Sequence, residues 1–242
     1  MKKKTDISDL LPYPGRLILL GKDQTGDNNV AVYAITGRSS SSKERRLEKD
    51  NEKIKVVPGN KDILERGNPD LLIYPAMIIK NGIAVSNGKQ TKDLANNMNP
   101  EKNPVDILCN ALKRWKYEPD EPHFTPRISG IILQSGRAGL CIIKRADNGG
   151  IIKNYFEFPL IEGKGNVLST YAGKNNDPLP SFKGEPRLLD IKEVTAEKTA
   201  LDIYHRMAPE RQEKDFRVAV VCVYWNTKSG EYTVHISNRT KG

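Results

Sequence analysis

Short apolar runs alternate with turn-forming segments along most of the chain, as is typical of antiparallel strands joined by hairpins. Residues 17–21 and 30–36 are rich in branched aliphatic side chains and flank a polar stretch of Asp, Asn and Gly. Residues 72–80 and 83–86 flank the dipeptide Asn81-Gly82, which favours a tight hairpin turn. These patterns predict two hairpins, each of which delivers polar residues at the ends of its strands.

The second half of the chain repeats this alternation. Residues 138–145 and 151–158 flank an Asn-Gly-Gly turn, and residues 217–225 and 232–237 form another pair of apolar runs. We expect both pairs to be hairpins, together with a strand over residues 127–134.

Two segments show the spacing of apolar positions that is typical of amphipathic helices. The clearer helix opens at Asn103-Pro104, an N-cap residue followed by proline at the first helical position. A second helix is expected over residues 194–207. Strand hairpins interrupted by two helices predict an α+β protein with antiparallel sheets. The apolar face of the first helix is expected to pack in the core and comprises Ile107, Leu108, Ala111, Leu112 and Trp115.

Two internal segments are expected to lack regular structure. Residues 172–187 are rich in Gly, Asn, Asp and Pro, which are turn-forming residues. Residues 39–53 hold four serines followed by alternating charges, which is compatible with a solvated loop or with a basic lid. The lid residues would be Lys43, Arg45 and Arg46.

Composition narrows the classes of partner. The 242 residues carry a formal net charge of +9, but the basic residues are scattered among 30 acidic ones, and only 7% of residues are aromatic. Few side chains are therefore available to stack on nucleic-acid bases. No apolar run approaches the roughly 20 residues that span a bilayer, and the first dozen residues lack the apolar core of a secretory signal. We expect neither a nucleic-acid partner nor a membrane.

Cysteine and histidine usage argues against disulfides and metals. Cys109, Cys141 and Cys222 are far apart in sequence, which predicts buried thiols in a reducing compartment and favours the cytoplasm. The three histidines lack the helical i, i+4 pairing of zinc enzymes, and the chain contains no P-loop or dinucleotide fingerprint. We expect no metal and no cofactor.

Arginine, asparagine and threonine stand beside glycine or proline at the ends of four predicted strands. Arginine offers a planar fork of donors that suits phosphate, and glycine lets a ligand approach the backbone closely. Four such motifs predict one anion-binding cleft. The motifs are Tyr13-Pro14-Gly15-Arg16, Ile35-Thr36-Gly37-Arg38-Ser39, Val85-Ser86-Asn87-Gly88 and Thr125-Pro126-Arg127.

Taken in order, these motifs resemble those of the archaeal-type IMP cyclohydrolases. Two more matching segments are Tyr117-Glu118-Pro119-Asp120-Glu121 and Leu168-Ser169-Thr170-Tyr171. The resemblance implies one domain over residues 13–242, behind a polar lead-in at residues 1–12. It also implies the four-layered α-β-β-α sandwich of N-terminal-nucleophile hydrolases. The nucleophile of those enzymes would be missing, because the strand that should present it begins with Gly15-Arg16.

The resemblance further implies a reaction. The family closes the purine ring of 5-formamidoimidazole-4-carboxamide ribotide, a phosphorylated purine precursor, to give inosine monophosphate (IMP) and water. Both reacting groups belong to one molecule, so holding the reactive conformer contributes much of the catalysis. A base must take a proton from the carboxamide, and an acid must protonate the departing oxygen. No cofactor or covalent nucleophile is required.

Three residues are candidate catalytic groups. Glu118 and Glu121 are candidate acid–base residues, and clustering with Asp120 would raise the pKa of at least one of them by like-charge repulsion. Tyr171 can polarise an oxygen or stack on the imidazole. The alternatives are an exposed acidic turn for the two glutamates and a core position for the tyrosine.

Eight residues are candidates for substrate binding. The arginines are expected to bind phosphate or the carboxamide oxygen, and the Ser-Asn-Gly segment is expected to bind ribose or base. The alternatives are arginines that form surface ion pairs and an Asn-Gly turn that is purely structural. The candidates are Arg16, Arg38, Ser39, Ser86, Asn87, Gly88, Thr125 and Arg127.

Two other functions stay open at this point. One is a relative of the same fold that binds or acts on a different phosphoribosyl ligand. The other is a basic nucleic-acid-binding module, which would show steeply salt-dependent binding. The sequence also leaves open whether the protein is a homo-oligomer.

Overall fold

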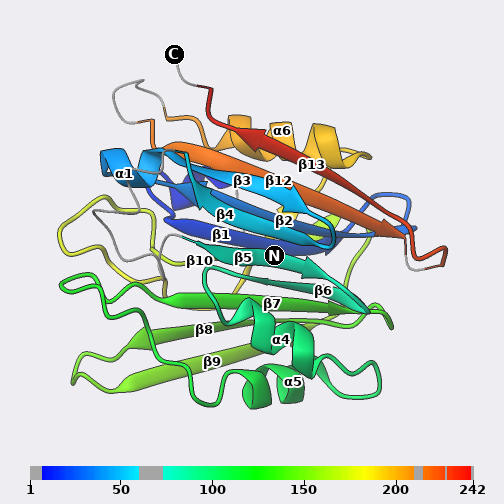
Figure 1. Cartoon of the computed structure of the whole chain (residues 1–242), viewed down its shortest axis with the longest axis horizontal. Helices are drawn as coiled ribbons and strands as arrows, with labels where there is room; N and C mark the ends of the chain where they lie inside the picture. The colour runs from blue at the N-terminus through cyan, green and yellow to red at the C-terminus, as the bar shows by residue number, and fades with distance from the viewer. Residues whose placement is uncertain (1–6, 60–72, 210–214, 227, 241–242) are drawn as a thin grey trace, which may run out of the picture.

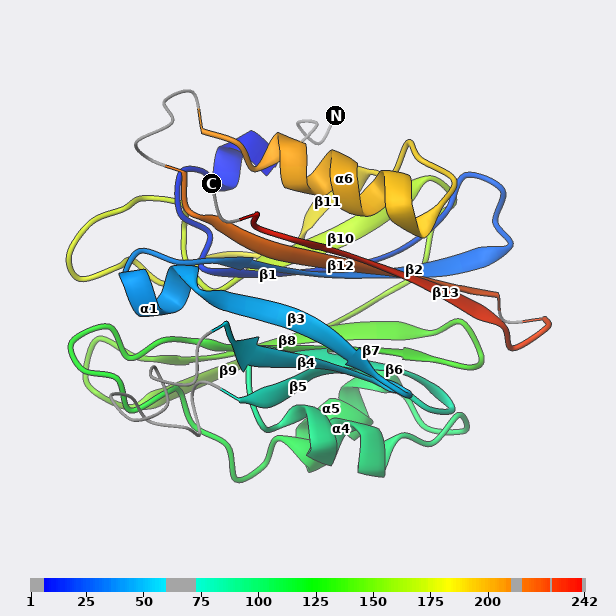
Figure 2. The same ribbon diagram turned by 45° about the horizontal axis from the view of Figure 1, so that its top comes forward.

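The computed structural model describes residues 7–59, 73–209, 215–226 and 228–240. Its strands form two antiparallel sheets of six and seven strands (Figure 1). Figure 2 shows the two sheets stacked face to face, with helices on both outer sides. None of the helices in the described ranges is long and apolar enough to cross a membrane.

The six-stranded sheet joins the two ends of the chain. β1 and β2 occupy its centre, where β1 also pairs with β10 and β2 also pairs with β12. In order across the sheet, the strands are β11 (Arg187–Asp190), β10 (Lys164–Ser169), β1 (Arg16–Lys22), β2 (Asn28–Thr36), β12 (Arg217–Asn226) and β13 (Tyr232–Asn238).

The seven-stranded sheet follows the order of the sequence, so each strand pairs with its neighbours along the chain. In such a meander, strands that are consecutive in sequence are neighbours in the sheet, and the connection from Ser86 to Arg127 contains two helices. Its strands are β3 (Arg45–Asp50), β4 (Lys53–Pro58), β5 (Tyr74–Ile79), β6 (Gly82–Ser86), β7 (Arg127–Leu133), β8 (Ala138–Arg145) and β9 (Ile151–Phe158).

The helices lie on the outer faces of the sheets. Figure 2 shows α6 (Ala196–Arg206) over the six-stranded sheet, and α4 (Thr91–Asn97) with α5 (Pro104–Ala111) beneath the seven-stranded sheet. The remaining helices are short: a 3-10 turn, η1 (Ile7–Leu10), and one turn of α-helix, α1 (Ser40–Lys43).

The main hydrophobic core lies between the two sheets. Its buried cluster includes Leu20 of β1 and Leu140 of β8, which belong to different sheets. Gly130 of β7 lies between them, because a Cβ atom there would come within 3.0 Å of Leu20 and 2.9 Å of Leu140. The sheets therefore approach closely at the point where β7 carries no side chain.

All four predicted hairpins are confirmed. β1 pairs with β2, β5 with β6, β8 with β9, and β12 with β13. The turn of the second hairpin lies at Asn81 and Gly82, whose φ angles are +54° and +132°. Residue 72, the expected first residue of that hairpin, lies outside the described residues. The loop expected over residues 172–187 carries no regular element before β11 begins at Arg187.

The two predicted helices form, but the first is shorter than expected. α5 ends at Ala111, so Trp115 lies beyond it. The indole Nε1 of Trp115 instead donates a hydrogen bond of 2.8 Å to Asp93 Oδ2 in α4. The second helix, α6, begins where the Thr195 hydroxyl accepts a hydrogen bond from the backbone of Lys198, as an N-cap does.

The prediction of an irregular segment over residues 39–53 is wrong. The serines form α1, and the charged residues after it form β3, which pairs with β4. β3 is an edge strand, so polar side chains can stand along it in solvent while Leu47 alone is fully buried. The sequence pattern of such a strand resembles that of a charged loop.

The expected polar lead-in also differs in part from the structure. Its lysine-rich residues 1–6 lie outside the described residues. Ile7 and Leu10 are 2% and 1% exposed and belong to the main core cluster. The lead-in therefore contributes apolar side chains to the core from residue 7 onward.

Candidate functional site

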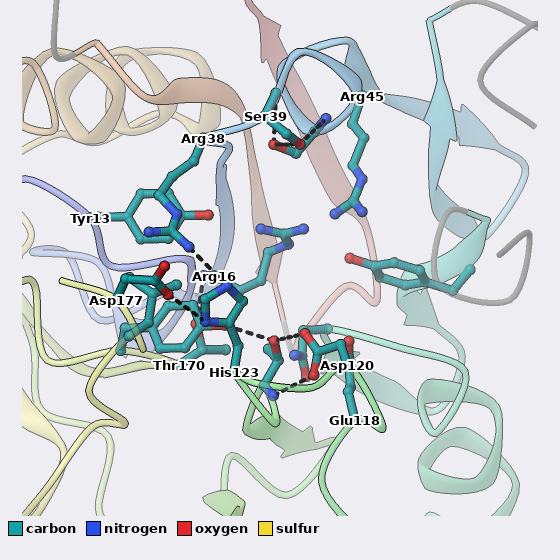
Figure 3. A pocket seen from close by; sticks show the side chains of 16 residues that line it. Tyr13, Arg16, Arg38, Ser39, Arg45, Glu118, Asp120, His123, Thr170 and Asp177 are labelled. Atoms are coloured by element: carbon teal, nitrogen blue, oxygen red, sulfur yellow. Dashed lines mark hydrogen bonds and ion pairs between the residues drawn. The ribbon is translucent and has the colours of Figure 1, made fainter. Parts of the chain in front are cut away.

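A cavity of about 600 Å³ opens where strand ends of the two sheets meet. Its walls come from the start of β1, the segment after β2, the starts of β3 and β5, the loop before β7 and the segment after β10. Figure 3 shows arginine side chains on one side of the cavity and carboxylates with a histidine on the other. The strand ends therefore meet as predicted. More strands contribute to the cavity than the sequence motifs had indicated.

Arg16 and Arg45 form the cationic wall. They start β1 and β3 in different sheets, and Figure 3 shows both guanidinium groups pointing into the same part of the cavity. The Nη1 atom of Arg16 donates to the carbonyls of Thr36, at 2.8 Å, and Gly15, at 3.3 Å, which fixes the guanidinium in place. Neither arginine forms an ion pair with a carboxylate of the described residues. Their charge is therefore available to an anion in the cavity.

Arg45 is unusual because its half-buried side chain contains an unsatisfied hydrogen-bond donor. Its Nε atom is buried and has no hydrogen-bond partner in the part of the chain that the structure describes. Burial and the nearby charge of Arg16 lower the pKa of the Arg45 guanidinium. A buried, unpaired donor is costly unless a ligand completes it. Arg45 is thus arranged to bind an anion.

Tyr74, at the start of β5, lines the same end of the cavity. Its hydroxyl lies 2.8 Å from that of Tyr33, a core residue that is fully buried. Tyr33 therefore fixes the Tyr74 phenol beside the two arginines.

Glu118 faces the arginines from the loop before β7. Burial raises the pKa of this carboxyl to about 7, and the negative charge of Asp120 adds to the shift while Arg127 and Arg16 oppose it. The sequence predicted a raised pKa from like-charge repulsion, and the larger cause in the structure is burial. A carboxyl that titrates near neutral pH can both give and accept a proton.

Arg127 lies behind Glu118 and does not line the cavity. Its Nη1 atom is 3.4 Å from Glu118 Oε1 and 3.1 Å from Gln90 Oε1, and its Nε donates to the Lys116 carbonyl at 2.9 Å. Its guanidinium also lies over the Trp115 ring, 5.0 Å from the centroid. These contacts hold the glutamate in position.

Asp120, Thr125 and Tyr171 form a chain of hydrogen bonds along the cavity wall. The Thr125 hydroxyl donates to Asp120 Oδ2, and the Thr125 amide donates to Asp120 Oδ1 at 2.6 Å. The Tyr171 hydroxyl lies 2.7 Å from the Thr125 hydroxyl. Tyr171 comes from the segment after β10, so this chain links the two sheets.

Arg38 forms hydrogen bonds that connect the loops at the mouth of the cavity. Its Nη2 donates to His123 Nε2 at 3.0 Å, and its Nη1 donates to Asn175 Oδ1 at 3.3 Å. The His123 ring therefore accepts at Nε2, and its Nδ1 lies 3.9 Å from Asp177 Oδ1. Arg38 also lies over the ring of Tyr13, 5.5 Å from its centroid.

The Ser86-Asn87-Gly88 segment is held mainly by structural hydrogen bonds. The Ser86 hydroxyl donates to the Gly88 carbonyl at 3.0 Å. The Asn87 side chain donates to the Pro126 carbonyl at 2.9 Å and accepts from the Ile128 amide at 2.8 Å. Of the three residues, Asn87 alone lines the cavity.

Two motif glycines make room for protein atoms. Gly15 has a φ of +74°, and a Cβ atom there would overlap Thr170 Oγ1 and the Tyr171 ring. A Cβ atom on Gly88 would collide with the Arg127 guanidinium and the Gln90 side chain. We expected these glycines to let a ligand approach the backbone. In the structure they instead allow close packing between segments of the protein.

The structure brings together seven of the predicted site residues at the cavity and leaves four outside it. The seven are Arg16, Arg38, Ser39, Asn87, Glu118, Thr125 and Tyr171. Glu121 is exposed, and Ser86, Gly88 and Arg127 stand behind the lining.

Other lining residues were not predicted as site residues. Arg45 was predicted only as a lid residue, and Asp120 only as a neighbour that perturbs the glutamates. The available signal for Asp120 was its place in the segment Tyr117-Glu118-Pro119-Asp120-Glu121, which matches the family. Tyr13 and Thr170 stood in the quoted motifs but were not named as site residues. The remaining residues carried no sequence signal of their own: Ser42, Tyr74, His123, Asp177 and Leu179. Within the described ranges, no group of three His, Cys, Asp or Glu side chains is placed to hold a metal ion.

Comparison with known proteins identifies the family to which the chain belongs. The family model described as IMP cyclohydrolase-like protein matches residues 13–229. A protein of Methanopyrus kandleri named IMP cyclohydrolase is 30% identical over 182 residues, which is 71% of this chain and 89% of that protein. A protein of the same name from Methanococcus aeolicus is 30% identical over 159 residues, or 66% of this chain and 74% of that protein. The chain belongs to the IMP cyclohydrolase-like family.

Proposed function

We propose that this protein is an IMP cyclohydrolase, which converts 5-formamidoimidazole-4-carboxamide ribotide to IMP with loss of water. The proposal rests on membership of the family and on the name that its relatives carry. The observation that carries it is the cavity itself, where two guanidinium groups that form no ion pair with a carboxylate of the described residues face a buried glutamate whose pKa is about 7.

The cationic wall binds the phosphate of the ribotide. Arg16 and Arg45 approach the same part of the cavity from the two sheets (Figure 3). The Tyr74 hydroxyl, which interacts with both arginines, is a further donor. Guanidinium groups match the planar, bidentate geometry of phosphate oxygens. Phosphate supplies the partner that the buried Nε of Arg45 lacks among the described residues.

Glu118 supplies the acid. At neutral pH a carboxyl with a pKa of about 7 is present in both forms, so its protonated form can protonate the formyl oxygen as the ring closes. Arg127 and the protein interior hold it in one orientation. Positioning matters here because attack by the carboxamide nitrogen on the formyl carbon is intramolecular.

Fold and location are proposed on the same basis. Two stacked sheets with helices outside them support the α-β-β-α sandwich of N-terminal-nucleophile hydrolases, with residues 13–242 acting as one domain. β1 begins at Arg16, where those enzymes would present a nucleophile. Cys109, Cys141 and Cys222 are free thiols, which supports a cytoplasmic location.

The test is turnover by the purified protein. Ring closure of the formylated ribotide is followed by absorbance, and saturable formation of IMP is the expected result. Folded protein that binds the ribotide without turnover would instead identify a relative that has kept the binding site and lost the activity. Tight, salt-dependent binding of DNA or RNA without ribotide binding would point to the nucleic-acid alternative.

A further inference from the structure

The hydrogen bonds between Asp120, Thr125 and Tyr171 have only one consistent direction. An ionised carboxylate can only accept hydrogen bonds, and a threonine hydroxyl has one proton to donate. The Thr125 hydroxyl donates that proton to Asp120 Oδ2. The 2.7 Å contact between the Thr125 and Tyr171 hydroxyls must therefore be a donation from Tyr171.

This direction determines what the tyrosine offers to a ligand. The Tyr171 proton is engaged by Thr125, so the phenolic oxygen offers only its lone pairs to a ligand in the cavity that it lines. A group in that position accepts a hydrogen bond from an N–H and does not polarise a carbonyl oxygen. The sequence had suggested that Tyr171 polarises an oxygen, and the hydrogen-bond direction disfavours that role.

Tyr171 is poorly suited to keep a negative charge. It is 4% exposed, and burial raises the pKa of its phenol. If the oxygen accepts a proton from a ligand, its own proton must leave at the same time. The hydrogen-bonded path to Thr125 and Asp120 is the route that the structure provides.

The threonine is held rigidly for this task. Phe124 precedes it with a φ of +43°, a conformation that costs energy in a residue other than glycine. The Phe124 ring packs edge-on against Tyr117, with centroids 5.6 Å apart, and beneath the Arg145 guanidinium at 4.3 Å. The Thr125 amide is also bonded to Asp120. Strain held by packing in this way is found preferentially at functional sites.

We propose that Asp120 is the general base of the proposed reaction and acts through Thr125 and Tyr171 as a proton relay. The inference rests on the proposed function, because it takes the carboxamide of the ribotide as the proton donor. Asp120 and Thr125 are then part of the catalytic machinery, and Thr125 is not a substrate-binding residue.

The proton balance closes over both steps. As the carboxamide nitrogen bonds to the formyl carbon, its proton moves to the Tyr171 oxygen, the Tyr171 proton to Thr125, and the Thr125 proton to Asp120. The electron pair of the formyl C=O bond moves to oxygen, which takes the proton of Glu118. In the dehydration, the relay runs in reverse to protonate the departing hydroxyl, and Glu118 takes the proton of the former formamide nitrogen. Both groups return to their starting states.

The test removes one hydroxyl from the relay and preserves the shape of the side chain that carried it. Thr125→Val retains the branched side chain and the amide bond to Asp120, and Thr125→Ser retains the hydroxyl. We expect Thr125→Val to lower kcat by about 100-fold, within the range of general acid–base catalysis, with KM within about threefold. Thr125→Ser is expected to recover most of kcat. The solvent deuterium isotope effect on kcat should also shrink in Thr125→Val, because fewer protons move together.

The chain offers a matched control far from the cavity. Thr199 and Tyr224 form another buried pair of hydroxyls, 2.8 Å apart, between α6 and β12. Thr199→Val removes the same atom and should leave kcat and its isotope effect unchanged. A second pair of variants removes phenol hydroxyls: Tyr171→Phe should lose activity, whereas Tyr224→Phe, which removes the other hydroxyl of the control pair, should not.

The outcomes separate the relay from the proposed function. Wild-type turnover together with an undiminished kcat in Thr125→Val or Tyr171→Phe would overturn the relay alone. Equal losses in Thr125→Val and Thr125→Ser would also overturn it, since packing and not the hydroxyl would then matter. Absence of turnover in folded wild-type protein would overturn the proposed function and the relay with it. Retained IMP binding in each variant shows that its site is folded.

Discussion

Oε1 of Glu118 lies 3.4 Å from Nη1 of Arg127, and the two side chains are 12% and 10% exposed. The arginine lowers the pKa of the glutamate, but burial outweighs it and holds the pKa at about 7. An ion pair at this distance in a buried site does not fully compensate the desolvation of the carboxylate. The pair therefore keeps Glu118 in place and leaves it able to exchange a proton near neutral pH.

Glu118→Gln should separate catalysis from stability. Loss of the acid is expected to lower kcat by about 100-fold. The folded protein binds the Glu118 proton more tightly than the unfolded chain does, because the pKa is raised from 4.5 to about 7. The contribution of Glu118 to the free energy of unfolding is therefore complete below about pH 4.5 and is lost as the pH rises through 7. The total loss is about 3 kcal/mol.

Thermal unfolding at two pH values checks this prediction. Glu118→Gln should be more stable than wild type at pH 8.5, and the difference should vanish near pH 4. Glu121→Gln is the control, since Glu121 is exposed and lies outside the cavity lining. Equal pH dependence of wild type and Glu118→Gln would contradict the assignment of a raised pKa.

Arg127→Met should change the pH profile more than substrate affinity. The charge of Arg127 lowers the pKa of Glu118. Removing that charge should therefore move the basic limb of the pH profile of kcat to higher pH. KM should change little, because Arg127 does not line the cavity. Arg137→Met, which breaks the surface pair with Glu157 at 2.9 Å, should leave the profile unchanged. A large rise in KM with an unshifted profile would restore Arg127 as a substrate-binding residue.

Arg45→Met should have opposite effects on stability and binding. Removing a half-buried charge whose Nε has no partner among the described residues should raise the melting temperature of the ligand-free protein. IMP binding should weaken by about 10- to 100-fold, because a hydrogen bond to a charged group contributes about 1.5–3 kcal/mol. Arg46→Met is the control, because Arg46 follows on the same strand but is exposed and paired with Glu48. Unchanged IMP binding in Arg45→Met would remove Arg45 from the phosphate site.

Gly15→Ala should disturb the site through packing. Both Gly15 and Gly136 have positive φ angles, +74° and +79°, so alanine is strained at either position. Only at Gly15 would the added Cβ meet other atoms, those of Thr170 and Tyr171. Gly15→Ala should therefore be less stable than Gly136→Ala and should lose activity, as measured by thermal unfolding and ring closure. Equal effects would mean that backbone strain alone matters.

The secondary structure was largely determined by local sequence. The Asn81-Gly82 turn and the apolar spacing of residues 194–207 depend on residues close in sequence, so their patterns predicted a hairpin and a helix that the structure contains. β3 was missed because an edge strand can carry charged residues on its solvent face, and such a strand resembles a loop in sequence. β10 was not predicted as a strand, although Leu168 and its neighbours matched the family.

The site was only partly determined by sequence. Motifs identified Arg16, Glu118 and Tyr171, because these segments match a family in order along the chain. The motifs could not show that Arg127 stands behind Glu118, since that arrangement depends on which face of β7 turns toward the cavity.

Only the tertiary structure decided which groups meet. Arg45 joins Arg16 because two sheets stack face to face, and Tyr171 reaches Thr125 across 46 positions of sequence. Turn chemistry and side-chain periodicity act over a few residues, whereas such contacts arise when the buried faces of the sheets pack together. The sequence by itself therefore determined the hairpins, the helices and the family, and packing determined the cationic wall, the state of Glu118 and the hydrogen-bonded chain to Asp120.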